Sequence, residues 1–64
     1  EFSKRLKDLR LENGLTQTEI SRILGIRQNT YSYWENGISQ PRIEMLKKIS
    51  DYYRVSMDYL TGRL

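Results

Sequence analysis

The chain has 64 residues, enough for one small domain, and it contains neither cysteine nor histidine. These absences exclude disulfides, zinc sites built on thiolates or imidazoles, and Cys–His or Ser–His nucleophile pairs. Eleven Lys and Arg residues against eight Asp and Glu give a formal net charge of +3. This mild basic bias suits a polyanionic partner, but many ordinary small domains share it.

The sequence predicts neither a membrane segment nor a secretion signal. No stretch approaches the roughly 18 apolar residues that span a bilayer, and no signal peptide is visible. We therefore expect a cytoplasmic protein. Residues 1–64 are expected to form a single domain, and a start at Glu1 rather than methionine is compatible with a fragment of a longer protein.

The first predicted helix begins near Phe2, because Phe2, Leu6 and Leu9 recur at the spacing of one helix face. It ends at the Asn-Gly pair at 13–14, since glycine readily takes the left-handed conformation in which helices commonly stop. The second predicted helix starts at Thr16, which forms a capping box with Glu19. Its inner face is predicted to be apolar, with Ile20, Ile23 and Leu24.

A third helix is predicted after residues 25–27, with Tyr31 and Trp34 on its inner side and an Asn-Gly pair at 36–37 as its end. The second and third helices are joined by only about three residues around a glycine. So short a connection makes two helices cross steeply rather than lie side by side. Ser21, a small residue, sits where the two helices would approach most closely.

Two more helices are predicted in the C-terminal part. Pro41 is placed at the first position of the fourth helix, where its missing N–H costs nothing. Ser56 is expected to cap the fifth helix and Gly62 to close it. The fourth helix is expected to turn inward Leu46, Ile49 and Tyr53, with Ile43 and Met45 partly so. No stretch reads as a strand, so the predicted fold class is all-α, with five short helices around one core.

This pattern resembles the helix-turn-helix of Cro/cI-type, lambda-repressor-like (XRE-family) DNA-binding domains, and the resemblance covers nearly the whole chain. It implies that the second and third helices form the helix-turn-helix. Arg27 departs from a usual capping Ser or Thr, which predicts a different cap, and Tyr31 departs from a usual Ile or Val, which predicts a wider slot in the core. The segments that carry the resemblance are RLKDLR at 5–10, GLTQ at 14–17, LGI at 24–26, SYWENG at 32–37, Pro41 and VSMDYL at 55–60.

In such a fold the third helix enters the major groove of DNA, with its N-terminal side chains against base edges. Carboxamides suit that role, because each can donate and accept at once, as pairing with adenine requires. The resemblance implies a base-reading face of Arg27, Gln28, Asn29, Ser32 and Tyr33. It also implies contacts to the DNA backbone from Gln17, Thr18, Asn36 and Arg42.

Plainer explanations exist for some of these residues. Gln28 and Asn29 are residue types common at any solvated helix start. Arg27 could read guanine or hold a phosphate. Tyr33 could touch a phosphate or a thymine methyl, or only shield the edge of the core. Tyr31 and Trp34 need no explanation beyond core packing.

Two further groups of residues carry expectations. The resemblance implies a structural ion pair between Arg10 and Glu35, whereas two unrelated surface charges would contribute about 0–1 kcal/mol. Tyr52, Met57 and Tyr59 are predicted to be partly exposed near the C-terminus. They are either ordinary surface side chains or, because three lie close in sequence, a subunit interface.

The predicted function is sequence-specific binding of double-stranded DNA by a transcriptional regulator. It is expected to be a repressor that acts as a homodimer on a two-fold symmetric operator. The alternative is an antitoxin-like module that uses the same fold to bind a protein partner. An enzyme is not expected, because the acidic residues are scattered and no nucleophile–base pair or Gly-rich phosphate loop occurs. No cofactor, metal or membrane partner is expected.

Overall fold

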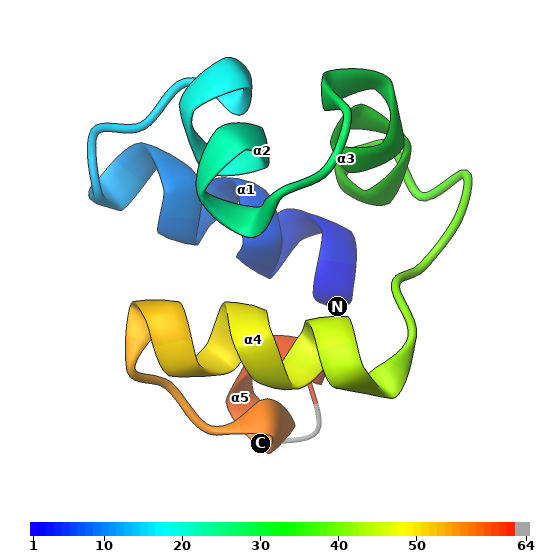
Figure 1. Ribbon diagram of the computed structural model, residues 1–64. Helices are drawn as coiled ribbons and strands as arrows, with labels where there is room; N and C mark the ends of the chain where they lie inside the picture. The colour runs from blue at the N-terminus through cyan, green and yellow to red at the C-terminus, as the bar shows by residue number, and fades with distance from the viewer. Residues whose placement is uncertain (63–64) are drawn as a thin grey trace.

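The computed structural model describes residues 1–62, and over this range the chain forms five α-helices and no strand. Figure 1 shows α2 and α3 on one side of α1, and α4 and α5 on the other. The predicted all-α class is therefore confirmed. The helices are α1 (Phe2–Glu12), α2 (Gln17–Leu24), α3 (Gln28–Glu35), α4 (Ile43–Tyr53) and α5 (Met57–Thr61).

One apolar core receives side chains from all five helices. Burying a Leu, Ile or Phe side chain stabilises a fold by about 1.5–3 kcal/mol. The stability of so small a domain therefore depends on each core side chain. Tyr31 is completely buried, and its ring meets Trp34 edge-on at 6.0 Å between centroids, so the expected wide slot in the core is filled. The core residues are Phe2, Leu6, Leu9, Ile20, Leu24, Tyr31, Trp34, Ile49 and Leu60.

The helix ends follow the signals in the sequence. Thr16 Oγ1 accepts from the Glu19 N–H at 3.1 Å, and Glu19 Oε1 accepts from the Thr16 N–H at 2.8 Å, which completes the predicted capping box. Ser56 Oγ accepts from the Tyr59 N–H at 2.9 Å and caps α5. Gly25 ends α2 with φ +74°, a left-handed conformation that glycine adopts without steric cost.

Three predictions about the fold are wrong. Ile23 is 42% exposed, because the short helix α2 packs chiefly on α3 and needs only a narrow apolar stripe. Pro41 is not the first residue of α4, since Arg42 has an extended backbone and stands at the N-cap position of a helix that begins at Ile43. As the first residue of α4, Ile43 is 64% exposed instead of partly buried.

No helix within residues 1–62 is both long and apolar enough to cross a membrane.

Candidate functional site

Helices α2 and α3 cross closely because the connection between them is short and a small residue, Ser21, lies between them. The Ile26 N–H donates to the Ser21 carbonyl at 3.0 Å, which holds the turn after Gly25 against the end of α2. Ser21 itself is buried, as expected for the point of closest approach, and its hydroxyl donates to the Gln17 carbonyl at 2.6 Å. A buried hydroxyl with a partner avoids the cost of an unsatisfied donor.

Helix α3 has one packed face and one open face. Tyr31 and Trp34 occupy the packed face, while the residues predicted to read bases lie on the open one. Four of these are exposed and the fifth, Ser32, is half-buried and accepts from Asn36 Nδ2 at 3.3 Å. The exposed four are Arg27, Gln28, Asn29 and Tyr33.

The start of α3 lacks a side-chain cap. Arg27 stands at the N-cap with an extended backbone, and its side chain makes no capping hydrogen bond. This agrees with the expectation that the third helix is capped differently from helices that begin with Ser or Thr. The exposed side chain of Arg27 is therefore available to a ligand, and the N–H groups of the first turn have no side-chain acceptor at the N-cap.

A side-chain bridge that sequence reasoning missed joins the two helices at their outer edge. The Thr18 hydroxyl in α2 donates to Gln28 Oε1 at the start of α3, over 3.0 Å. Both residues were predicted to contact DNA, but as separate groups with separate roles. The bridge depends on the crossing of the two helices, which brings together residues ten positions apart in the chain. Patterns within one helix do not predict it.

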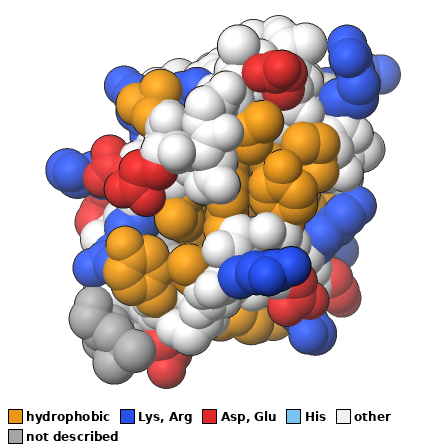
Figure 2. All heavy atoms as spheres, turned by 90° about the vertical axis from the view of Figure 1, so that its left-hand side faces the viewer, with side chains coloured by type: hydrophobic (Ala, Val, Ile, Leu, Met, Phe, Trp, Pro, Cys, Tyr) orange, Lys and Arg blue, Asp and Glu red, His pale blue; other side chains and the backbone are white. Residues whose placement is uncertain are grey.

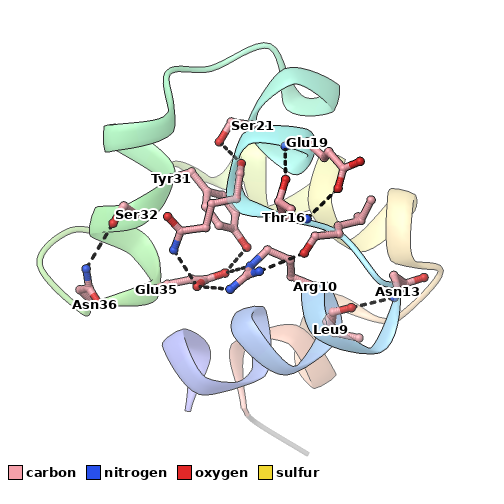
Figure 3. A network of polar contacts seen from close by, with 12 residues as sticks. Leu9, Arg10, Asn13, Thr16, Glu19, Ser21, Tyr31, Ser32, Glu35 and Asn36 are labelled. Atoms are coloured by element: carbon pink, nitrogen blue, oxygen red, sulfur yellow. Dashed lines mark hydrogen bonds and ion pairs between the residues drawn. The ribbon is translucent and has the colours of Figure 1, made fainter.

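The ion pair expected between α1 and α3 is present. Arg10 Nε donates to Glu35 Oε2 at 2.7 Å and Arg10 Nη2 donates to Oε1 at 3.1 Å, so the pair is bidentate. Arg10 Nη1 also donates to the Leu15 carbonyl at 2.9 Å. The two charged side chains are only 10% and 3% exposed, and Figure 3 shows them between the helices.

The Glu35 carboxylate accepts hydrogen bonds from side chains of three helices. Besides Arg10 of α1, Gln17 of α2 donates through Nε2 to Oε1 at 3.1 Å, and Tyr31 of α3 donates its hydroxyl to Oε2. We call these four residues, Arg10, Gln17, Tyr31 and Glu35, the Glu35 junction. Gln17 was predicted to contact the DNA backbone, and its half-buried amide is tied to this junction by one of its two N–H groups.

The junction keeps its charges at neutral pH. Burial alone raises the pKa of Glu35, but the hydrogen bonds from Arg10, Tyr31 and Gln17 outweigh burial and lower the pKa below its ordinary value. The hydrogen bond to Glu35 raises the pKa of Arg10. Burial, and then the hydrogen bond to Glu35, raise the pKa of Tyr31, which keeps its hydroxyl protonated as a donor.

The remaining predicted backbone contacts flank the loop from α3 to α4, at the right of Figure 1. Asn36 is the C-cap of α3 and Arg42 is the N-cap of α4, and both are exposed. Arg42 makes no side-chain capping hydrogen bond. Its exposed side chain is therefore not occupied in capping α4.

The three residues considered for a subunit interface have different neighbours. Tyr52, 43% exposed, packs its ring edge-on against Tyr53, and Tyr59, 40% exposed, lies under the Arg5 guanidinium at 4.4 Å. Met57 lines a hollow that also includes the exposed Ile43. Figure 2 shows hydrophobic side chains gathered in the middle of another face, the one on the left of Figure 1, with charged side chains around them.

Known proteins are similar to this chain in sequence and in structure. A helix-turn-helix family model matches residues 6–60. The cryptic phage CTXphi transcriptional repressor RstR of Vibrio cholerae is 37% identical over 61 residues, which are 95% of this chain and 55% of RstR. The transcriptional regulator ImmR of Bacillus subtilis is 42% identical over 62 residues, which are 97% of this chain and 49% of ImmR.

A solved structure agrees with the sequence comparison. The crystal structure of a transcriptional regulator from Listeria innocua superimposes with a TM-score of 0.92 at 32% identity, over 97% of this chain and 58% of that protein. The chain thus spans about half the length of the two relatives above.

Proposed function

The chain belongs to the helix-turn-helix family, and from this premise we propose that it binds specific sequences of double-stranded DNA as a transcriptional regulator. The observation that carries the proposal is the division of α3 into a packed aromatic face and an exposed polar face. We further propose that it represses transcription in the cytoplasm, because a similar protein, RstR, is named a repressor. The proposal includes no catalytic step and no cofactor.

In this proposal the N-terminal half of α3 lies in the major groove. Gln28 and Asn29 read base edges, since a carboxamide offers a donor and an acceptor side by side, as adenine requires. Arg27 adds a cation that can pair with guanine or a phosphate. Ser32 and Tyr33, one helical turn further along, meet the edge of the same site.

Contacts to phosphates hold the reading helix in place. The Gln17 amide has two N–H groups, and because Glu35 occupies one of them, the other can donate to a phosphate at the start of α2. The N-terminus of a helix favours an anion at the same place. Asn36 and Arg42 contact the backbone from the two ends of the loop after α3.

Two copies of the chain bind together in this proposal. Regulators with a helix-turn-helix bind two half-sites about one helical turn of DNA apart, and the two-fold symmetry of the dimer matches the symmetry of the operator. The candidate residues for the interface are Tyr52, Met57 and Tyr59, because their side chains remain partly exposed.

Selection of bound duplexes from a random DNA pool tests the proposal. The expected result is an enriched inverted repeat, which reports specificity and two-fold symmetry together. A variant with Gln28→Ala and Asn29→Ala serves as a control, since it keeps the fold but should enrich poorly. Failure to enrich any sequence, with the protein folded, would contradict the proposal and favour the alternative, an antitoxin-like module that binds a protein.

A further inference from the structure

The bridge between Thr18 and Gln28 is a side-chain hydrogen bond that joins α2 directly to the first residue of the proposed reading helix. The Thr18 hydroxyl donates to Gln28 Oε1 at 3.0 Å. Both side chains are exposed, so the bridge lies at the surface proposed to meet DNA. It adds no contact to the apolar core.

The bridge favours one orientation of the Gln28 carboxamide. A carboxamide has an acceptor oxygen and a donor nitrogen, and rotation about its last side-chain bond exchanges their positions. Thr18 uses one lone pair of Oε1, so the oxygen is held toward α2 and Nε2 is directed away from it. The second lone pair of Oε1 and an N–H of Nε2 stay available, side by side, for a base.

The same bridge changes what Thr18 itself can do. A threonine hydroxyl carries a single hydrogen, and phosphate oxygens only accept. The hydroxyl of Thr18 therefore cannot donate to Gln28 and to a phosphate at the same time. If the Thr18 hydroxyl donated to a phosphate of the DNA backbone, as the sequence predicted, its hydrogen bond to Gln28 would be lost.

We propose that Thr18 is a specificity-determining positioning residue, whose hydroxyl orients the Gln28 carboxamide toward its base pair. The inference rests on the proposed function, because it needs Gln28 to read a base. In the free protein the exposed bridge competes with water and is weak. In a groove from which water is excluded, the bridge is stronger and decides which end of the amide donates.

The test compares Thr18→Val, which keeps the shape of the side chain but removes the hydroxyl, with Thr18→Ser, which keeps the hydroxyl. Each variant and the unaltered protein select duplexes from a random pool, and Gln28→Ala identifies the base pair that Gln28 reads. Thr30→Val makes the same change at an exposed threonine of α3 and serves as the matched control. Thermal unfolding checks that every variant is folded.

The inference expects a change at one base pair. Thr18→Val should reduce the base preference at the pair read by Gln28 by about two- to tenfold, the effect of one hydrogen bond. Thr18→Ser and Thr30→Val should keep the original preference, and affinity for unrelated DNA should not change.

Three other results would overturn the inference. If Thr18→Val keeps the original preference at that base pair, the bridge does not orient Gln28. If Thr18→Val weakens all duplexes alike, Thr18 contacts the backbone instead. If the unaltered protein enriches no sequence, the proposed function fails and this inference falls with it, whereas the first two results leave the proposed function intact.

Discussion

Gln28 and Asn29 are not needed for packing, because Tyr31 and Trp34 already provide the packed face of α3. We expect Gln28→Ala and Asn29→Ala each to weaken binding to the selected operator by about 1–3 kcal/mol. Binding to unrelated DNA should weaken much less, since it depends on phosphates that these amides do not contact. Mobility-shift titrations with both duplexes measure the difference.

Arg42→Ala provides the opposite pattern and the control. It should weaken binding to both duplexes alike, because a phosphate contact carries no sequence information. If the two amide variants also lose equally on both duplexes, the open face of α3 does not read bases.

The Arg10–Glu35 ion pair is buried, so removing one partner should lower the free energy of unfolding strongly. Arg10→Met leaves the Glu35 carboxylate without its cation and should lower the free energy of unfolding by about 3 kcal/mol, the lower end for such losses, because Tyr31 and Gln17 still donate to Glu35. Glu35→Gln should also destabilise. The double variant should lose less than the sum, as measured by urea unfolding, and additive losses would show that the charges do not interact.

Acid should weaken the fold through Glu35. The pKa of Glu35 is lower in the folded chain than its ordinary value of 4.5, so the unfolded chain takes up a proton first as the pH falls. The stability that Glu35 contributes is therefore complete above about 4.5 and is lost as the pH falls through the folded pKa. Urea unfolding across acidic pH should show a smaller loss for Glu35→Gln than for the unaltered protein, with the same change at the exposed Glu12 as the matched control.

At the scale of elements, α3 begins without a side-chain cap. Arg27→Ser supplies an oxygen that can accept from the backbone N–H groups of the first turn, so it should stabilise the fold by about 1 kcal/mol. For a domain of this size that raises Tm by about 4–8 °C. The same change should weaken DNA binding, because a cation at the reading end of the helix is lost. Thermal unfolding measures the gain in stability, and mobility shifts measure the loss of affinity. If Arg27→Ser is no more stable and binds DNA as well as the unaltered protein, Arg27 neither weakens the helix start nor contacts DNA.

Helix starts and ends could be predicted from the sequence because their signals are local. The Thr16–Glu19 capping box, the Ser56 cap and the Gly25 turn depend on residues within a few positions of one another, and all three occur in the structure. The error at Pro41 is also local, since proline fits equally well just before a helix and at its first position, and the sequence does not separate the two.

Contacts between helices were predictable only where the family pattern supplied them. The ion pair of Arg10 with Glu35 was expected on that basis. The bonds of Gln17 to Glu35 and of Thr18 to Gln28 depend on the crossing of α2 and α3, which periodicity within one helix does not describe. Ile23 was misplaced for the same reason, because how much of a helix is covered depends on its neighbours.

For the whole molecule, the proposed function predicts a strong dependence of DNA binding on salt. The chain has a net charge of +3, and each phosphate neutralised releases condensed counterions. The logarithm of affinity should fall linearly with the logarithm of salt concentration, by nearly one unit per phosphate contact. Arg42→Ala should reduce the slope by about one. A flat response in mobility-shift titrations would argue against DNA as the partner.

The Glu35 junction also bears on how long the folded chain survives. Its donors come from α1, α2 and α3, so it can be completed only after these three helices have docked. Interactions completed late in folding slow unfolding rather than accelerate folding. Small helical proteins, whose contacts are mostly local, fold on the order of microseconds to milliseconds. We therefore expect Glu35→Gln to shorten the lifetime of the native state more than it slows folding, because the bonds that the carboxylate accepts form late.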